Sequence, residues 1–234
     1  MSDWIFFDCF NTLIDDFDDT DSESGLGSLP EFAVEQGAAQ SRDEFLSAYR
    51  LACPVNAGDY AEVLLPARLT RALDSLGRLP PEGVGSVVQR LLDRWHAEYE
   101  PNLRLTPGAT EMLAHWYGSR RMGVVSNFYF PGYPQRYLER FGIDHYFEFV
   151  LDSASLGHRK PGSLILEVAL RRAGCSPADV LFIGDRPDLD IEPAQRLGMS
   201  ALHLDRRSVR PRAQRTPAGF DSVRHWDEFR RDRS

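Results

Sequence analysis

The stretch FFDCFNTLI, residues 6–14, has the pattern of a buried β-strand that ends in a carboxylate. Its apolar run begins at Trp4 and stops at Asp8, and the polar pair Asn11 and Thr12 follows closely. Buried parallel strands are short apolar runs, and α/β proteins bind ligands just beyond the carboxyl ends of such strands. Asp8 therefore stands where a parallel sheet would place a functional group.

The composition of the 234 residues is that of a globular protein. A hydrophobic share of 42% and a charged share of 26% are ordinary, and this length can bury a core without disulfides or a structural metal. The net charge of −8 disfavours a general nucleic-acid binder.

The chain shows no sign of secretion or membrane insertion. No apolar run approaches the roughly 18 residues of a membrane span, and no signal peptide is visible. The cysteines, Cys9, Cys53 and Cys175, are odd in number and form no CxxC pair, which favours a reducing compartment. We therefore expect a soluble, cytoplasmic protein without nucleic-acid or membrane partners.

Further strand-like runs alternate with amphipathic segments along the chain. The runs are MGVVS (122–126), FEFVL (147–151), VLFIG (180–184) and SALHL (200–204). The amphipathic segments between them cover 108–119, 132–142 and 162–174. This alternation predicts an α/β fold, a Rossmann-like core of parallel strands with helices on both faces.

Residues 15–103 interrupt the alternation. Helical periodicity recurs there at 29–39, 41–52, 60–77 and 84–100, without a clear strand. We therefore predict a helical-bundle cap at 15–103, inserted into a core formed by 1–14 and 104–234. The acidic stretch 15–23 lacks the glycine and the closing glutamate of a calcium loop, and we interpret it as a solvated connector.

Polar side chains follow the other predicted strands as well. Ser126 and Asn127 end one strand, Asp185 ends another, and Asp190 lies close behind it. Lys160 is the only lysine in a chain that otherwise uses arginine, and an ammonium group differs from a guanidinium as a compact point charge. Parallel strands bring these groups to one edge of the sheet.

The motifs that contain these residues resemble those of the haloacid dehalogenase-like (HAD) superfamily over nearly the whole chain. They are DCFNT (8–12), VVSN (124–127), KPG (160–162) and GDRPDLD (184–190). Their order and spacing match members with a helical cap inserted after the first motif. The resemblance implies a hydrolase, most often a phosphatase of a small phosphate ester, acting as a monomer or homodimer.

The resemblance also implies a role for each matching residue. Asp8 would attack phosphorus and form an aspartyl-phosphate. Lys160 would neutralise the transferring phosphoryl group, and Ser126 and Asn127 would bind it. Thr12 would belong to the catalytic set by shaping the turn with Asn11. A Mg²⁺ ion would be held by four groups: Asp8, the backbone carbonyl of Phe10, Asp185 and Asp190.

Phe10 departs from the pattern of the phosphatases that this chain resembles. They carry a second aspartate there, which protonates the leaving group and activates water, and phenylalanine can do neither. Losing a positioned acid-base costs about 10²–10⁴ in rate. His158, Asp15 and Asp16 are candidate substitutes, although surface roles are the simpler interpretation.

Three functions therefore stay open at the level of sequence. The first is a Mg²⁺-dependent phosphohydrolase that is slow or borrows its acid from elsewhere. The second is a hydrolase acting on carbon like the 2-haloacid dehalogenases, which also lack the second aspartate, although they lack an acid equivalent to Asp185 as well. The third is a phosphate-binding or regulatory protein with little turnover. A Schiff-base mechanism on a cap lysine is excluded, because Lys160 is the only lysine.

Overall fold

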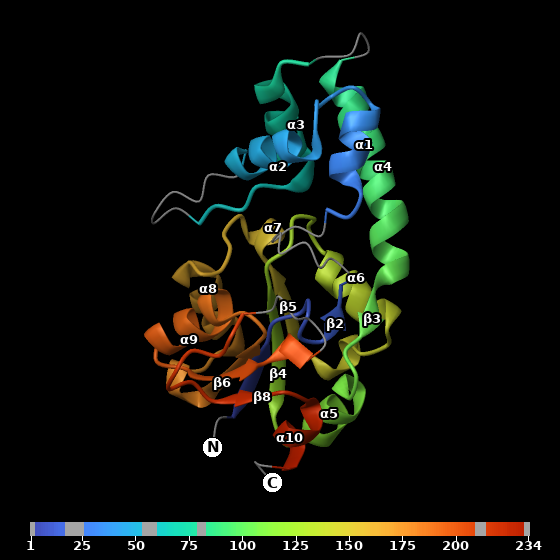
Figure 1. Cartoon of the computed structure of the whole chain (residues 1–234). Coiled ribbons are helices and arrows are strands. Elements are labelled where there is room, and N and C mark those ends of the chain that lie inside the picture. Colours follow the sequence, from blue (N-terminus) through green and yellow to red (C-terminus); the bar gives the residue numbers. More distant parts are fainter. Residues whose placement is uncertain (1–2, 17–25, 53–59, 79–82, 209–213, 232–234) are drawn as a thin grey trace. The chain divides into compact units, whose positions relative to one another are not determined.

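The computed structural model describes residues 3–16, 26–52, 60–78, 83–208 and 214–231. The chain divides into two compact units (Figure 1). The first comprises Met1–Asp15, Gly58–Glu62 and Arg104–Ser234, and the second comprises Asp16–Ala57 and Val63–Leu103. Cys53 and most of the acidic stretch 15–23 lie outside the described residues.

The first unit is built on a parallel sheet with the strand order β5-β4-β1-β6-β7-β8. The strands are β1 (Trp4–Phe7), β4 (Arg121–Ser126), β5 (Phe149–Asp152), β6 (Val180–Gly184), β7 (Ser200–Leu204) and β8 (Ser222–Val223). A separate antiparallel pair joins β2 (Ile14–Asp15) to β3 (Arg104–Leu105). The predicted α/β fold with a Rossmann-like parallel sheet is therefore confirmed.

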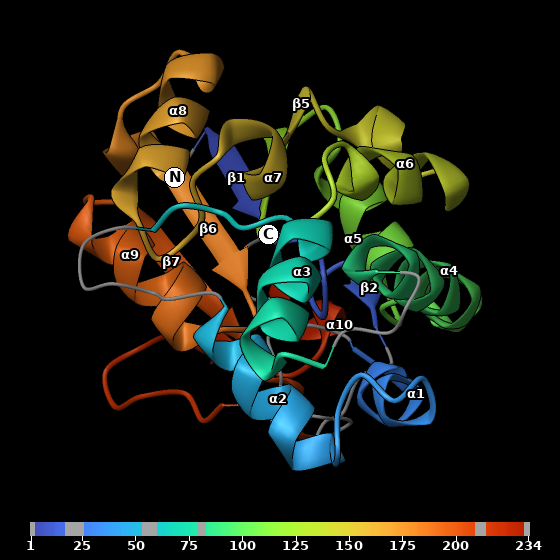
Figure 2. The same cartoon turned by 90° about the horizontal axis from the view of Figure 1, so that it is seen from above.

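Helices cover both faces of this sheet. They are α5 (Ala109–Trp116), α6 (Tyr133–Arg140), α7 (Ser153–Leu156), α8 (Ser163–Ala173), α9 (Glu192–Arg196) and α10 (Trp226–Arg231). Successive residues of β1 point to opposite faces, so Phe6 packs in the core with α8 and α9, whereas the ring of Phe7 meets Trp226 of α10. Figures 1 and 2 show α8 and α9 on one side of the sheet and α5 and α6 on the other.

The strand order places β1 at a topological switch point. β4 flanks it on one side and β6 on the other, so that Phe7 pairs with both Val124 and Ile183. The carboxyl ends of the three strands are thereby level with one another. The residues that follow them, Asp8 above all, lie at one edge of the sheet, where ligands bind in open α/β sheets.

The second unit is helical among its described residues. Its helices are α1 (Leu29–Glu35), α2 (Arg42–Leu51), α3 (Leu65–Leu76) and α4 (Val84–Asn102). Apolar side chains at helical spacing fill its interior, and they include Phe45, Leu69, Leu91 and Trp95. Its polar contacts include the Glu98 carboxylate, which accepts hydrogen bonds from the backbone N–H and the hydroxyl of Ser28.

Two predicted elements differ from those observed. The helix predicted at 60–77 begins at Leu65, because Pro66 fits only its first turn, and residues 60–62 belong to the first unit. The strand predicted at 147–151 spans Phe149–Asp152, because a 3₁₀ turn occupies Asp144–Tyr146. Among the described residues, no helix combines the length and the apolar character that crossing a lipid bilayer requires.

Candidate active site

The side chain of Lys160 lies at the centre of the candidate site. Its Nζ donates to Asp8 Oδ1 at 2.7 Å, to Asp190 Oδ1 at 2.6 Å and to the carbonyl of Val125 at 2.8 Å. The residue is 1% exposed, so three acceptors meet the three donors of a buried ammonium group. Burial lowers the pKa of Lys160, but Asp190 and Asp8 outweigh it and raise the pKa to about 12. The lysine is therefore a permanent cation.

Asp8 follows β1 and is buried. Burial raises its pKa, Lys160 lowers it and Asp190 raises it again, and the result is a pKa of about 6 instead of the ordinary 3.8. Thr12 donates a hydrogen bond to the other carboxylate oxygen, Oδ2, at 3.2 Å. Asn11 makes this contact possible with a left-handed φ of 61°, which turns the chain back towards Asp8.

Asp185 and Asp190 come from the loop after β6. Asp190 lies in a π-helical turn, Pro187–Ile191, and its carboxylate also accepts the N–H of Arg186 at 3.0 Å. A Cβ atom on Gly184 would stand only 2.5 Å from the Cγ of Asp190. Glycine at this position therefore lets the carboxylate fold back onto the strand end.

The three carboxylates form a group that fits a divalent cation. Oxygen atoms of Asp8, Asp185 and Asp190 lie within 4.8 Å of one another, and all three residues are buried. Lys160 neutralises only part of their charge, and buried charge that stays uncompensated is costly. Hard oxygen ligands of this kind suit Mg²⁺. The donor set and the charge balance both favour such an ion.

Asn127 contacts the backbone of Lys160 rather than its side chain. Its amide oxygen accepts the N–H of Lys160 at 2.8 Å, and its amide nitrogen donates to the carbonyl of Lys160 at 2.9 Å. This cyclic pair joins the loops after β4 and before α8. Ser126 is fully buried, with its hydroxyl 3.4 Å from the carbonyl of Asn127.

The structure thus brings Asp8, Thr12, Lys160 and Asp190 into direct contact and Asp185 next to them. Sequence comparison gives this arrangement a context. The profile of the haloacid dehalogenase-like hydrolases matches residues 3–198. The chain belongs to this family.

The curated relatives of this hydrolase include phosphatases. A glyceraldehyde 3-phosphate phosphatase of Methanothermobacter thermautotrophicus is 40% identical over 85 residues, which are 35% of this chain and 36% of the relative. The chain therefore spans about a third of the length of that protein. A phosphoglycolate phosphatase of Haemophilus influenzae is 28% identical over 76% of this chain and 80% of its own length.

A solved structure shares the fold of this hydrolase. It is a 2-haloacid dehalogenase from Pseudomonas syringae, with a TM-score of 0.69 and 20% identity. The alignment covers 98% of this chain and 96% of the other. At this identity the likeness concerns the fold alone.

Phe10 of this hydrolase is held in an aromatic stack. Its ring lies on Phe128 with the centroids 4.5 Å apart and the planes at 19°, and Tyr137 meets it edge-on at 6.2 Å. Only 8% of the residue is exposed. The ring of Phe10 is therefore held in place by these aromatic contacts, and its side chain offers no proton to a substrate.

Asp15, a proposed substitute for the missing acid, is already bound within the first unit. Both of its carboxylate oxygens accept from Arg206 Nη2, at 2.6 and 2.7 Å, and Thr106 donates to it at 3.2 Å. This pairing makes Asp15 a structural group. His158 is half-buried beside residues 60–62, opposite Ala61. The fully buried thiol of Cys9 has its pKa raised by burial and by Asp8, so it is a poor nucleophile at neutral pH.

His203 supports the site in a way that the sequence did not indicate. It is fully buried on β7, and its Nε2 lies 3.0 Å from the carbonyl of Asp185, while its Nδ1 lies 2.7 Å from the hydroxyl of Thr216. The carbonyl of Asp185 can only accept, so Nε2 donates in this contact, and burial lowers the pKa of His203 from its ordinary value. A single histidine within an apolar strand carries no signal of this contact.

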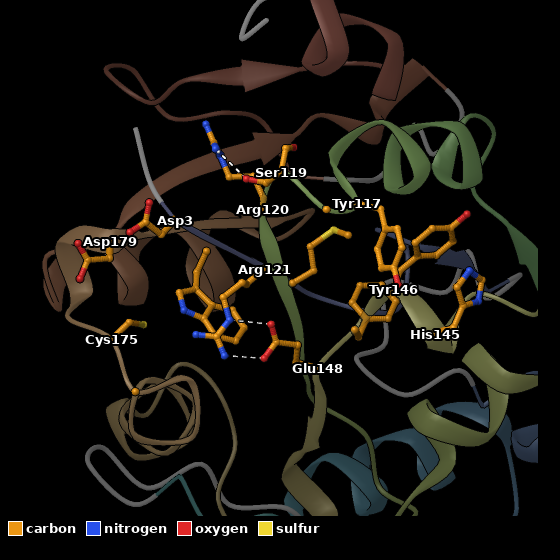
Figure 3. A pocket seen from close by; sticks show the side chains of 15 residues that line it. Asp3, Tyr117, Ser119, Arg120, Arg121, His145, Tyr146, Glu148, Cys175 and Asp179 are labelled. Carbon is orange, nitrogen blue, oxygen red and sulfur yellow. Dashed lines mark hydrogen bonds and ion pairs between the residues drawn. The ribbon is translucent and has the colours of Figure 1, made fainter.

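A pocket of about 770 Å³ lies at the opposite edge of the sheet, by the amino ends of the strands (Figure 3). Arg121 crosses it to bind Glu148 with two hydrogen bonds of 2.6 Å and lies over the ring of Trp4. Because β1 runs from Trp4 to Phe7, this pocket lies a strand length away from Asp8. It takes no part in the candidate site.

Proposed function

We propose that the protein is a Mg²⁺-dependent phosphohydrolase that cleaves a small organic phosphate through an aspartyl-phosphate on Asp8. The observation that carries this proposal is the group of three buried carboxylates, two of which bind a single ammonium. The carboxylates of this group suit a metal cation, and the ammonium suits a phosphoryl dianion. The named phosphatases among the relatives support the same class of substrate.

The residues of the chain divide the work between attack and charge neutralisation. A carboxylate oxygen of Asp8 forms a bond to phosphorus as the ester P–O bond breaks, and the leaving oxygen takes its proton from solvent or substrate. Water then attacks phosphorus, frees Asp8 and releases inorganic phosphate. Lys160 holds Asp8 in place and offsets the charge of the phosphoryl oxygens.

The proposed ligands of Mg²⁺ are Asp8, Asp185, Asp190 and the backbone carbonyl of Phe10. The ion would neutralise charge on the phosphoryl group and on the nucleophile, which otherwise repel each other. His203 would keep the Asp185 loop in position for this. Because the ligand from residue 10 is a carbonyl, the aromatic side chain there is compatible with the metal site.

We place substrate selection in the helical unit, as the cap predicted at 15–103. In this proposal the described site residues of the first unit supply the nucleophile, hold the metal and bind the phosphoryl group. None of them is specific for the organic part of a substrate, and a separate unit is the usual place for that role in enzymes that sequester their substrate.

The test is phosphate release from a panel of small phosphate esters, with Mg²⁺ and with a chelator. We expect release that requires the metal and that is lost in Asp8→Asn, which keeps the shape of the side chain but lacks the nucleophile. Release that persists with a chelator, or in Asp8→Asn, would contradict the proposal.

Phe10 favours a second candidate, a hydrolase that acts on carbon. An aromatic residue in place of the acid resembles the 2-haloacid dehalogenases, whereas Asp185 adds a negative charge that a carboxylate substrate would meet. This function predicts release of halide from 2-chloro acids without metal, in a reaction that ignores a chelator. The same protein preparation tests both functions.

A further inference from the structure

A short segment of the first unit, residues 60–62, pairs with the residues directly before Lys160. We call it the strap. It pairs antiparallel with residues 157–159, directly before Lys160, through the N–H of Arg159 to the carbonyl of Tyr60 at 2.8 Å and the N–H of Glu62 to the carbonyl of Gly157 at 2.9 Å. The strap therefore holds the loop that directly precedes Lys160.

The strap also contacts the chain on the far side of Lys160. A Cβ atom on Gly162 would stand 2.8 Å from Cδ2 and 2.9 Å from Cβ of Tyr60. Any side chain at residue 162 would push Tyr60 away. The close approach requires glycine and places the strap against both flanks of the lysine.

Glu62 anchors the strap through its side chain. The carboxylate is 2% exposed, it accepts the hydroxyl of Ser153 at 2.5 Å, and it lies 3.8 Å from Nε of Arg159, which is itself buried. A carboxylate that is removed from water is stable only when it is paired and hydrogen-bonded. Glu62 is therefore committed to these partners.

Ser153 binds both Glu62 and the backbone of Phe128. Its hydroxyl oxygen accepts the N–H of Phe128 at 3.0 Å. The hydroxyl has a single proton. It donates this proton to Glu62 at 2.5 Å, because the carbonyl of Phe128 lies farther away, at 3.0 Å. Phe128 directly follows Ser126 and Asn127 and carries the ring that stacks on Phe10. Glu62 thus stands where the loop of Lys160 and the loop of Ser126 meet.

A second carboxylate of the first unit is placed in the same way. Asp15 and Glu62 are each the last residue of a stretch of the first unit before the chain passes into the second. Asp15 binds the hydroxyl of Thr106 and the guanidinium of Arg206. Glu62 likewise pairs with a hydroxyl and an arginine. A buried or half-buried carboxylate therefore holds the chain at each of these two exits from the first unit.

We propose that Glu62 is a positioning residue, which holds the strap, Ser153 and Arg159 together and so sets the relative position of Lys160 and the Ser126–Phe128 loop. Only the predicted change in kcat rests on the proposed function. The predicted change in structure concerns the backbone amides of Phe128 and Arg159, and their hydrogen exchange can be measured without turnover.

The structural test is hydrogen exchange of the amides of Phe128 and Arg159. In Glu62→Ala both should exchange at least about 10-fold faster than in the wild type, because their acceptors are no longer held. Glu62→Gln keeps an acceptor for Ser153, so the protection of Phe128 should be largely restored. Glu98→Ala is the matched control, since Glu98 makes a similar contact with Ser28 and Arg94 in the second unit and should leave both amides unchanged.

The kinetic test compares kcat and KM of the same variants on the best phosphate ester. Glu62→Ala should lower kcat about 10- to 100-fold, as a small displacement of reacting groups does, with KM changed much less. Ser153→Ala should have an effect of the same kind, and the double variant should lose little more than either single variant.

The outcomes separate the inference from the function. Unchanged exchange at Phe128 in a folded Glu62→Ala protein would overturn the inference, and so would independent, additive losses in the double variant. A wild type that releases no phosphate from any ester would instead overturn the proposed function, and the exchange result would still decide the role of Glu62.

Discussion

Lys160 Nζ lies 2.7 Å from a carboxylate oxygen of Asp8 and 2.6 Å from one of Asp190, and it joins strands that are far apart in the sequence. Both ion pairs are buried, so each charged group is stable there only because the oppositely charged groups are present. The lysine therefore has a structural and a chemical role at once, and the two can be separated by experiment.

Replacing this lysine should destabilise the protein and abolish its reaction. Lys160→Met leaves buried carboxylates without their cation, which should cost about 3–5 kcal/mol in the free energy of unfolding. Arginine should not substitute, because its planar fork cannot meet three acceptors that surround a point charge. Urea unfolding measures the loss, with Arg196→Met as the control.

That control removes an exposed ion pair, Arg196 with Glu192 at 3.8 Å, and should cost about 1 kcal/mol or less. Equal losses in the two variants would mean that the buried pairs contribute nothing particular. If Mg²⁺ occupies the carboxylate group, it should stabilise Lys160→Met more than it stabilises the wild type, whereas Arg196→Met, which keeps the site, should gain as much as the wild type.

Introducing the missing acid at position 10 should not raise the rate of phosphate release. Phe10→Asp removes a ring that Phe128 and Tyr137 enclose and puts a carboxylate among aromatic side chains. The lost packing alone should cost about 3–5 kcal/mol. Phe10→Leu keeps an apolar group and should be milder. A faster Phe10→Asp enzyme would show that the stack can open and that lost acid-base function limits the reaction.

Phosphate esters with acidic leaving groups should be the best substrates. Phe10 supplies no proton, and Asp15 is bound to Arg206, so we expect the leaving oxygen to depart with little help. Across a series of substituted phenyl phosphates of similar size, kcat/KM should rise steeply as the pKa of the phenol falls. If kcat/KM did not vary with the pKa of the phenol, a general acid would be at work, whose contribution is typically about 10²–10⁴ in rate.

The stability of the metal-free protein should fall as the pH rises from 3.8 towards about 6. Burial, with a further contribution from Asp190, raises the pKa of Asp8 to about 6 against the pull of Lys160, and the ordinary value is 3.8. The folded state therefore binds more protons than the unfolded state in this window, and stability is lost as Asp8 ionises. Mg²⁺ needs the ionised carboxylate and should offset the loss above pH 6 or so. Thermal unfolding with and without Mg²⁺ measures both effects, and Asp8→Asn should remove the slope.

The sequence predicts the core and the central group of the site for a simple reason. Parallel strands are apolar throughout, so their ends are visible as the places where polar residues begin, as at Asp8 and Asp185. The sheet then brings these ends together, and Lys160 attracts notice because it is the only lysine.

The contacts that surround this group could not be predicted. The strap at 60–62 is too short to have a period of its own. Its residues continue the helical pattern of 60–77, although the helix itself begins only at Leu65. Glu62 and Ser153 lie far apart along the chain, and His203 looks like any residue of its strand. Each of these residues gains its role from a tertiary contact, which local patterns do not encode.

The most direct test of the central claim is the fate of solvent oxygen during turnover in water enriched in the heavy isotope. Attack of water on the phosphorus of an aspartyl-phosphate puts one solvent oxygen into the released phosphate and none into Asp8. Hydrolysis of a carbon ester on Asp8 would put it into the aspartate carboxylate. We predict labelled phosphate and an unlabelled Asp8 peptide by mass spectrometry, and label in Asp8 would contradict the account.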